Sequence, residues 1–233
     1  MLAIRLSQTR LLGMVNDMDQ TKVIRTRFWI MLAMVLLAAG TRLVTPALGL
    51  FNVSPIGALA LFGGACFASP AAALLVPLSA MALSDVGLYA LYGNPPSWPT
   101  YVCFALLVVI GFCLRRQRTK AMIVGATAIS SVVFYLVTNS AWWLLSPNVA
   151  LPASFPSTFF EQVAWAFSPA AAMVYGYPKT VDGYLACMIA GIPFFPYTLA
   201  GDGFFMFALF GGWAFVEKRI EARQPVLAAV STA

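Results

Sequence analysis

Five polar side chains stand inside an otherwise apolar sequence: Arg42, Asn52, Asp85, Asn139 and Asp202. An ionisable side chain in hydrocarbon costs at least about 2.5 kcal/mol on insertion scales, so it persists mainly where it has a partner, water or a ligand. The group therefore indicates a small-molecule binding site. Its formal charge of one positive against two negative fits a cationic or amine-bearing ligand. Desolvation can also leave a carboxylate neutral, so the charge of the ligand stays open.

The composition of the chain places these residues in a membrane. Of the 233 residues, 61% are hydrophobic and only 9% are charged, and the mean hydropathy is +0.85. Such a chain has too little polar surface to cover a soluble globule. The composition therefore predicts an all-α polytopic membrane protein.

The net charge of +6 comes from basic residues in three short clusters that flank apolar runs. A nucleic-acid surface would show a basic stripe with interleaved aromatic residues, so no nucleic-acid partner is expected. The positive-inside rule places all three clusters in the cytoplasm. The clusters are Arg5, Arg10, Lys22, Arg25 and Arg27, then Arg115, Arg116, Arg118 and Lys120, and finally Lys218, Arg219 and Arg223.

The three cytoplasmic clusters constrain the number of membrane crossings, because the chain crosses the membrane an even number of times between two segments on the same side. Four plus two is the economical count, which predicts a six-transmembrane-helix bundle over residues 28–217, with the tails 1–27 and 218–233 in the cytoplasm. The second span is short, which requires little tilt, shielding by its neighbours or an irregular segment. The six predicted spans are Phe28–Leu48, Pro55–Ala68, Ala71–Tyr92, Trp98–Leu114, Ala121–Leu145 and Tyr197–Val216.

The segment 146–196, between the last two spans, is predicted to be an outer loop. It is rich in proline, so it cannot form one regular span. Within it, Phe159–Met173 and Tyr184–Ile192 are apolar enough for short helices at the outer interface. These helices either form a cap over a pocket or belong to an interfacial loop without a functional role. Long ordered loops in compact proteins are usually functional.

The candidate substrate-binding residues share one depth, toward the outer ends of the predicted spans. Carboxylates have short side chains, so Asp85 and Asp202 are expected to face the interior of the bundle. Arg42 either snorkels to the interface or forms an ion pair with Asp85 that is purely structural. The full set is Arg42, Asn52, Asp85, Asn139, Trp142 and Asp202.

Other kinds of chemistry have little support in the sequence. It contains no histidine, and its four cysteines form no CxxC pair, so neither a metal site nor another cofactor is expected. It also lacks the phosphate-binding GxxxxGK[ST] motif, so any ATP-driven step must come from other proteins. The four cysteines are Cys66, Cys103, Cys113 and Cys187.

Three pairs of small residues stand four positions apart and let helix backbones approach closely. They serve packing within the bundle or the docking of a partner membrane subunit. The pairs are Ala60 with Gly64, Ala121 with Gly125, and Ala186 with Ala190.

Several short motifs make the chain resemble an uncharacterised bacterial integral-membrane family over Arg42 to Gly212. The most extensive is the run FNVSPIGALALFGGA at residues 51–65. The others are Ser84-Asp85, Thr138-Asn139 followed by Trp142, Tyr177-Pro178 with Gly183, and Ile192-Pro193-Phe194-Phe195 leading to Gly201-Asp202. That family is in turn similar to the substrate-capture subunits, called S components, of energy-coupling factor vitamin transporters.

This resemblance implies a six-helix bundle in the bacterial cytoplasmic membrane that binds a vitamin or similar micronutrient from outside. Its partners would be a transmembrane coupling subunit and ATPases, besides membrane lipid. In that reading Arg42 orients a carboxylate of the ligand and Asn52 gates the site. S components often carry an AxxxA pattern in the first helix, whereas here Leu37 follows Ala33, which puts docking to a coupling subunit in doubt.

The expected function is therefore substrate capture and not catalysis. One alternative is a non-catalytic scaffold or assembly subunit, whose polar residues pair fully and leave no cavity. The other is a membrane-embedded enzyme that uses Asp85 and Asp202 as general acid and base, which requires the two carboxylates to lie a few Å apart.

Overall fold

The computed structural model describes residue 25 and the ranges 28–50 and 52–231, without the side chains of 172 and 216–231. Over these ranges the chain is helical and contains no strand, which confirms the all-α prediction. Most of the predicted tail 1–27 lies outside the described residues. Residues 28–44 form the first helix. The elements that follow are η1 (Thr45–Leu48), α2 (Pro55–Cys66), α3 (Pro70–Tyr92), α4 (Trp98–Cys113), α5 (Lys120–Leu145), α6 (Phe159–Ala166), η2 (Ala171–Met173), α7 (Val181–Gly191), η3 (Ile192–Phe194) and α8 (Phe195–Ser231).

Helix length and hydropathy indicate a membrane protein. In the described part of the chain, four segments are long and apolar enough to cross a membrane. The apolar helices α2 and α4 are shorter, with 12 and 16 residues. At 1.5 Å of rise per residue they reach about 18 and 24 Å, less than the roughly 30 Å of a hydrocarbon core. The four long segments are Phe28–Leu48, Pro70–Tyr92, Lys120–Leu145 and Val181–Phe215.

Local capping residues explain where the helices begin and end. The Ser54 hydroxyl accepts a hydrogen bond from the N–H of Ile56 at the start of α2, and Pro55 occupies the first helical position, where no N–H is needed. Ser69 and Pro70 repeat this arrangement at the start of α3. These signals lie in the sequence itself, which is why the predicted starts of the spans fall within two residues of the observed ones.

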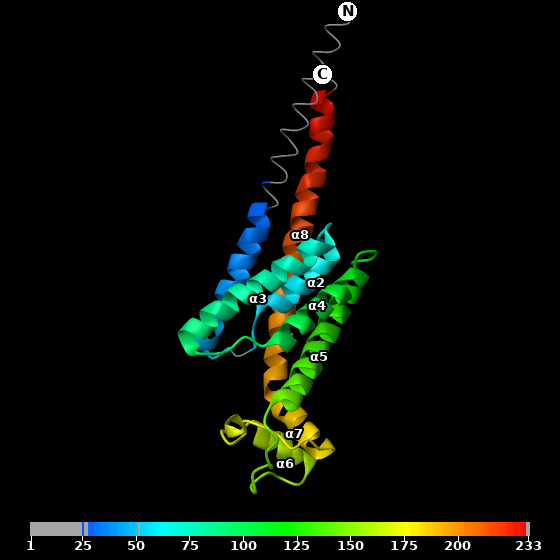
Figure 1. Ribbon diagram of the computed structural model, residues 1–233. Helices are drawn as coiled ribbons and strands as arrows, with labels where there is room; N and C mark the ends of the chain where they lie inside the picture. The colour runs from blue at the N-terminus through cyan, green and yellow to red at the C-terminus, as the bar shows by residue number, and fades with distance from the viewer. Residues whose placement is uncertain (1–24, 26–27, 51, 232–233) are drawn as a thin grey trace, which may run out of the picture.

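The short helix α2 lies inside the bundle, where it is packed against α3, α4, α5 and α8 (Figure 1). Residues 55–65 are all buried. A helix that is apolar on every side needs such surroundings, because it has no polar face to turn toward water. Of the three ways considered to accommodate the short second span, the structure has shielding by neighbouring helices.

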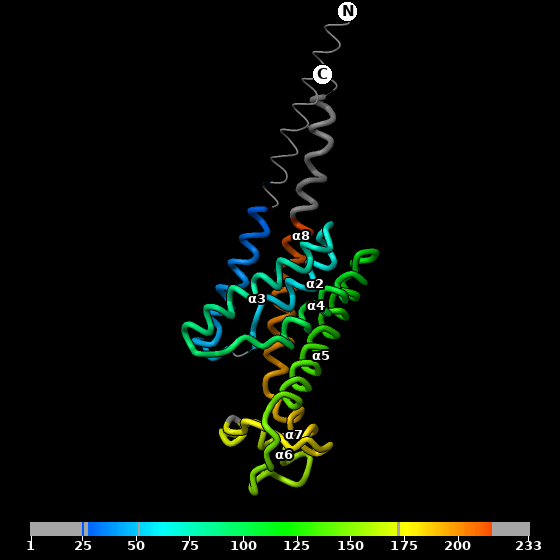
Figure 2. The backbone as a smooth tube through the Cα atoms, in the orientation of Figure 1, coloured from blue at the N-terminus to red at the C-terminus, as the bar shows by residue number. Residues whose placement is uncertain are grey.

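The helices α6 and α7 lie together at one end of the molecule, next to the C-terminal end of α5 (Figure 2). The Trp143 indole N–H donates to the Pro178 carbonyl oxygen at 2.9 Å, and the Lys179 ammonium donates to the Trp143 carbonyl. Tyr177 is buried in the same contact, and burial raises the pKa of its phenol to about 12. These bonds hold the α6–α7 segment on the end of α5.

The long helix α8 runs through 37 residues and ends at Ser231. The predicted last span was Tyr197–Val216, followed by a tail at 218–233. The helical backbone continues through residue 231, well beyond the apolar stretch, which ends at Phe215. Hydropathy marks where a helix can be embedded in a membrane, but it does not mark where helical backbone stops.

Arg115, just after the C-terminal end of α4, forms hydrogen bonds to the C-terminal end of α2. Its guanidinium donates from Nε to the Gly64 carbonyl at 2.8 Å and from Nη2 to the Phe67 carbonyl at 3.0 Å. It also lies 4.4 Å from the ring centroid of Phe112. These carbonyls belong to the last turn of α2 and its C-cap, where a helix lacks internal partners and attracts positive charge.

We therefore expect Arg115→Gln to lower the free energy of unfolding by about 1 kcal/mol, because it loses two hydrogen bonds from a charged group that solvent exposure weakens. The neighbouring exposed Arg116→Gln is the matched control and should change it by less than about 0.5 kcal/mol. Thermal unfolding in mild detergent measures both. Equal effects of the two substitutions would show that Arg115 acts only through surface charge.

Candidate functional site

A cavity of about 470 Å³ lies at the end of the bundle where α4 and α8 begin and α3 and α5 end. Cavities of about 300–1,000 Å³ are typical of small-molecule sites. Its rim includes the exposed residues Asn52, Asn94 and Trp142, so it is open at the surface. The lining residues are Arg42, Thr45, Pro46, Leu50, Asn52, Val53, Ser54, Leu88, Asn94, Ser97, Thr100, Phe104, Phe134, Tyr135, Thr138, Asn139, Trp142, Gly191, Phe194, Phe195 and Thr198.

Four of the six candidate residues from the sequence line this cavity. They come from the first helix, the loop before α2, and the end of α5, which the fold brings to one place. The two aspartates are not among the lining residues, although each lies in a polar network next to the cavity. The four are Arg42, Asn52, Asn139 and Trp142.

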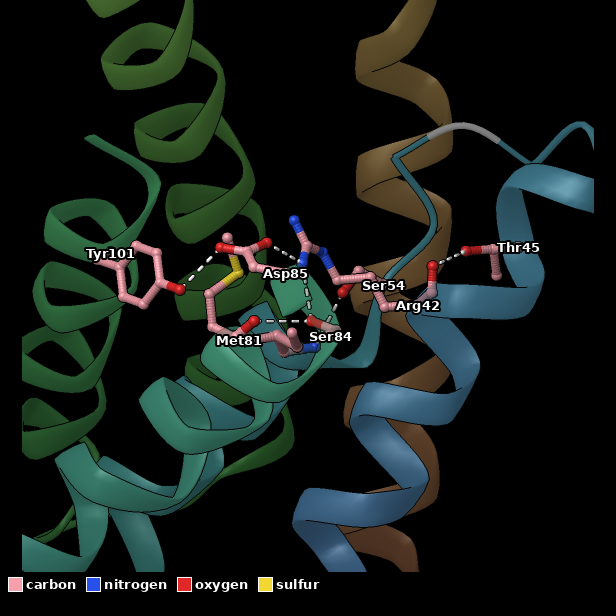
Figure 3. A network of polar contacts seen from close by, with 8 residues as sticks. Arg42, Thr45, Ser54, Met81, Ser84, Asp85 and Tyr101 are labelled. Atoms are coloured by element: carbon pink, nitrogen blue, oxygen red, sulfur yellow. Dashed lines mark hydrogen bonds and ion pairs between the residues drawn. The ribbon is translucent and has the colours of Figure 1, made fainter. Parts of the chain in front are cut away.

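Arg42 and Asp85 form an ion pair at the side of the cavity (Figure 3). The Arg42 Nη1 atom donates to Asp85 Oδ1 at 2.5 Å and to the Ser84 hydroxyl at 2.7 Å. The Tyr101 hydroxyl donates to the second oxygen of Asp85 at 2.7 Å. The network therefore joins the first helix, α3 and α4, and both oxygens of the Asp85 carboxylate are used within it.

Arg42 keeps part of its guanidinium for other partners. Among the described residues, its Nε and Nη2 atoms have no hydrogen-bond partner, and Figure 3 draws no dashed line to the second terminal nitrogen. Arg42 also lines the cavity. Guanidinium N–H groups are strong donors in a fixed geometry. This side chain can therefore hold Asp85 and donate to a bound molecule at the same time.

Asn52 lies at the rim of the cavity in a left-handed backbone conformation, with φ of 65°. Among non-glycine residues, asparagine adopts this conformation most readily, and such positions are frequent in turns and binding sites. The sequence marked Asn52 by its polarity, but its backbone geometry is visible only in the structure.

Asp202 lies about one helical turn deeper than the cavity lining. Thr198, four residues earlier in α8, is a lining residue, while Asp202 is 7% exposed and accepts a hydrogen bond from the Ser131 hydroxyl at 2.7 Å. A Cβ atom on Gly57 would stand 2.8 Å from Asp202 Oδ1. The carboxylate therefore lies against the first turn of α2, where the positive end of the helix dipole favours a negative charge.

The two aspartates belong to separate networks. Asp85 contacts Arg42 and Tyr101, whereas Asp202 contacts Ser131, and no hydrogen bond joins the two carboxylates. Neither of them lines the cavity. The arrangement lacks the shared proton that a carboxylate dyad needs for acid–base chemistry. Nor do three His, Cys, Asp or Glu side chains come together anywhere in the described ranges.

Aromatic side chains form much of the apolar wall, and sequence reasoning missed most of them. Phe104 and Phe134 are stacked, with ring centroids 5.6 Å apart and 30° between the ring planes. Tyr135 and Phe195 meet edge to face at 5.4 Å. Ser131 was missed as well. Phenylalanine and serine are common in membrane helices, so neither type carried a signal before the helix faces were known.

The comparison with protein families matches the chain from residue 22 to residue 226 to the model described as "Family of unknown function (DUF6580)". No curated protein and no solved structure matches the chain. The match covers the whole helical part that carries the cavity and both aspartate networks. The chain therefore belongs to the family of unknown function DUF6580.

Proposed function

We propose that the protein is a membrane-embedded substrate-binding protein, the capture subunit of a transporter for a micronutrient of the vitamin type. One observation carries this proposal: an open cavity of about 470 Å³ whose lining includes Trp142 and three residues singled out by their polarity in an apolar sequence, Arg42, Asn52 and Asn139. Polar groups that converge on a largely apolar cavity are typical of ligand sites. A polar side chain in a membrane helix persists where it has a partner or a ligand.

In this proposal the cavity faces the outside of the bacterial cytoplasmic membrane. It lies at the N-terminal end of α4, and the basic cluster Arg115 to Lys120 follows the C-terminal end of the same helix. The positive-inside rule assigns the basic end to the cytoplasm. With α2 and α4 counted as crossings, the chain has six spans and both termini in the cytoplasm.

The energy for transport would come from partner proteins, because the sequence has no phosphate-binding GxxxxGK[ST] motif. The resemblance to S components supports a transmembrane coupling subunit and ATPases as these partners. The first helix departs from the AxxxA pattern at Leu37, so the coupling subunit would dock on other small residues.

The scaffold alternative is less well supported than capture. A scaffold whose polar residues only join helices would bury them against one another and leave no sizeable cavity. Here Asn52 and Trp142 stand exposed at the rim of the cavity. The enzyme alternative requires a shared site for two carboxylates, and Asp85 and Asp202 have different partners.

The test is native mass spectrometry of the protein purified in mild detergent, comparing wild type with Thr100→Trp. Thr100 lines the cavity, so the indole would fill it. Val102→Trp is the matched control, because Val102 is 49% exposed on the same helix and is not a lining residue. We expect a small molecule to remain on wild type and on Val102→Trp, and its occupancy to fall at least about tenfold in Thr100→Trp, because its volume is taken.

Two outcomes would contradict substrate capture. A wild-type protein without any bound molecule, even when it is prepared from cells grown in rich medium, would favour the scaffold. A bound molecule that survives Thr100→Trp but is lost from Val102→Trp would place the ligand outside the cavity. Equal thermal stability of the two variants ensures that misfolding does not explain the loss.

A further inference from the structure

The charges around the cavity constrain what it can hold. Among the described residues that line it, Arg42 is the only charged one. Its guanidinium is already paired with Asp85 at 2.5 Å, and the Asp85 side chain is 6% exposed. The lining therefore carries a guanidinium whose charge is balanced by the carboxylate directly behind it. No unbalanced charge remains on the wall to act as the counter-ion of a charged ligand.

Asp202 does not supply that counter-charge. Its carboxylate lies one turn below Thr198, is bonded to the Ser131 hydroxyl, and lies against the first turn of α2. A ligand in the cavity is thus separated from it by the lining itself. A charged molecule that gives up part of its hydration on binding and meets no paired group gains little in return, which disfavours it.

The walls favour a flat molecule. Phe104 and Phe134 form a stacked pair at 5.6 Å, and Trp142 and Phe194 stand at the more exposed edge. Aromatic side chains prefer offset-stacked or edge-to-face contact with another ring. The polar groups of the lining are mostly uncharged hydroxyl and amide groups, and they also include the Nε and Nη2 donors of Arg42, which an acceptor oxygen of the ligand would satisfy.

We infer that the cavity takes an uncharged, planar ring compound bearing a carbonyl oxygen, which Arg42 binds without releasing Asp85. This inference rests on the proposed substrate-binding function and names the chemical class of the ligand. The formal charges in the sequence also allow a cationic ligand. The structure argues against one, because Arg42 and Asp85 neutralise each other in an ion pair and Asp202 does not line the cavity.

Three probes with the same three-ring frame separate charge from shape. Acridone is uncharged and has one carbonyl oxygen, 9-aminoacridine is cationic at neutral pH, and acridine-9-carboxylate is anionic. Binding is measured by quenching of tryptophan fluorescence, because Trp142 stands at the rim. The signal from Thr100→Trp in the same detergent defines the background from partition into micelles. We expect saturable acridone binding at least about tenfold tighter than that of either charged probe.

Phe134→Leu tests the ring contact, with Phe207→Leu as its matched control on α8, where Phe207 is 82% exposed and does not line the cavity. An aromatic pair contributes enough that Phe134→Leu should weaken acridone binding by about 2- to 12-fold, and Phe207→Leu should leave it unchanged. Equal thermal stability of the two variants keeps the comparison valid.

Each remaining outcome overturns the inference. Tighter binding of 9-aminoacridine would show that Asp202 attracts a cation through the lining, and tighter binding of acridine-9-carboxylate would show that Arg42 exchanges Asp85 for the ligand. No saturable binding of any probe, in a protein that retains a molecule in native mass spectrometry, would reject the planar class but leave substrate capture standing. Failure of both experiments would remove the proposed function itself.

Discussion

Gly64→Ala is expected to destabilise the protein strongly, by about 2–3 kcal/mol or more, because it forces apart the backbones of α2 and α4. A Cβ atom at Gly64 would stand 2.2 Å from the Val108 carbonyl oxygen and 2.9 Å from the Cα of Gly111. Both obstacles are backbone atoms, which cannot turn aside as a flexible side chain can. Overpacking of this kind costs about 1–3 kcal/mol and sometimes more. Thermal unfolding in detergent measures the loss.

The matched control is Gly125→Ala in the second turn of α5, where nothing lies within 4 Å of the added Cβ. Alanine is favoured over glycine inside a helix by up to about 1 kcal/mol, so this variant should be neutral or more stable. Both glycines belong to small-residue pairs that the sequence does not distinguish. Equal effects of the two substitutions would refute a close approach of α2 and α4 at Gly64.

The second large effect is expected for Asp85→Ala, which should lower the free energy of unfolding by about 3–5 kcal/mol. The substitution leaves the Arg42 guanidinium without its counter-ion, and breaking a buried pair from one side is costly for that reason. The Arg42 and Asp85 side chains are 22% and 6% exposed, so water compensates little. Tyr101 would lose its acceptor as well.

The double variant Arg42→Met with Asp85→Leu is the informative partner of this experiment. Replacing both charges by apolar side chains of similar volume is often close to neutral, so most of the lost stability should return. Thermal unfolding of wild type, Arg42→Met, Asp85→Leu and the double variant completes the cycle. Additive losses, without recovery in the double variant, would mean that the two side chains stabilise the protein independently of each other.

The double variant also separates stability from binding. If Arg42 donates to the ligand, Arg42→Met with Asp85→Leu should be stable but should retain less of the bound molecule than wild type in native mass spectrometry. This follows because Arg42 Nε and Nη2 are the donors left over from the ion pair.

The local part of the fold was accessible from the sequence. Ser54-Pro55 and Ser69-Pro70 mark helix starts through bonds between neighbouring residues, and the observed helices begin there. The lengths of the apolar runs indicated a membrane protein, because each spanning helix must by itself be long enough to cross the hydrocarbon core. The six crossings and the cytoplasmic termini stay predictions, since α2 and α4 fall short of the length that a span needs by itself.

The sequence predicted how deep along the helices the candidate residues lie, but not which of them line the cavity. Counting residues along each predicted span placed Arg42 and Asp85 near one level, and they form an ion pair. The same counting grouped Asp202 with the cavity, whereas its side chain points to Ser131 and the first turn of α2. Depth along a helix follows from residue number, but the direction of a side chain depends on the rotation of the helix about its axis.

By itself, the sequence determined that this is an all-α membrane protein, where most of its helices begin, and which polar residues need partners. These properties depend on short-range bonds and on the free energy of placing each side chain in hydrocarbon. Only the tertiary structure decided which polar residues line the cavity, which ones pair behind it, and which aromatic rings form its wall. The reason is that the rotation and tilt of membrane helices are set by packing against neighbouring helices, such as the contact of Gly64 with Gly111, and this packing joins residues far apart in the chain.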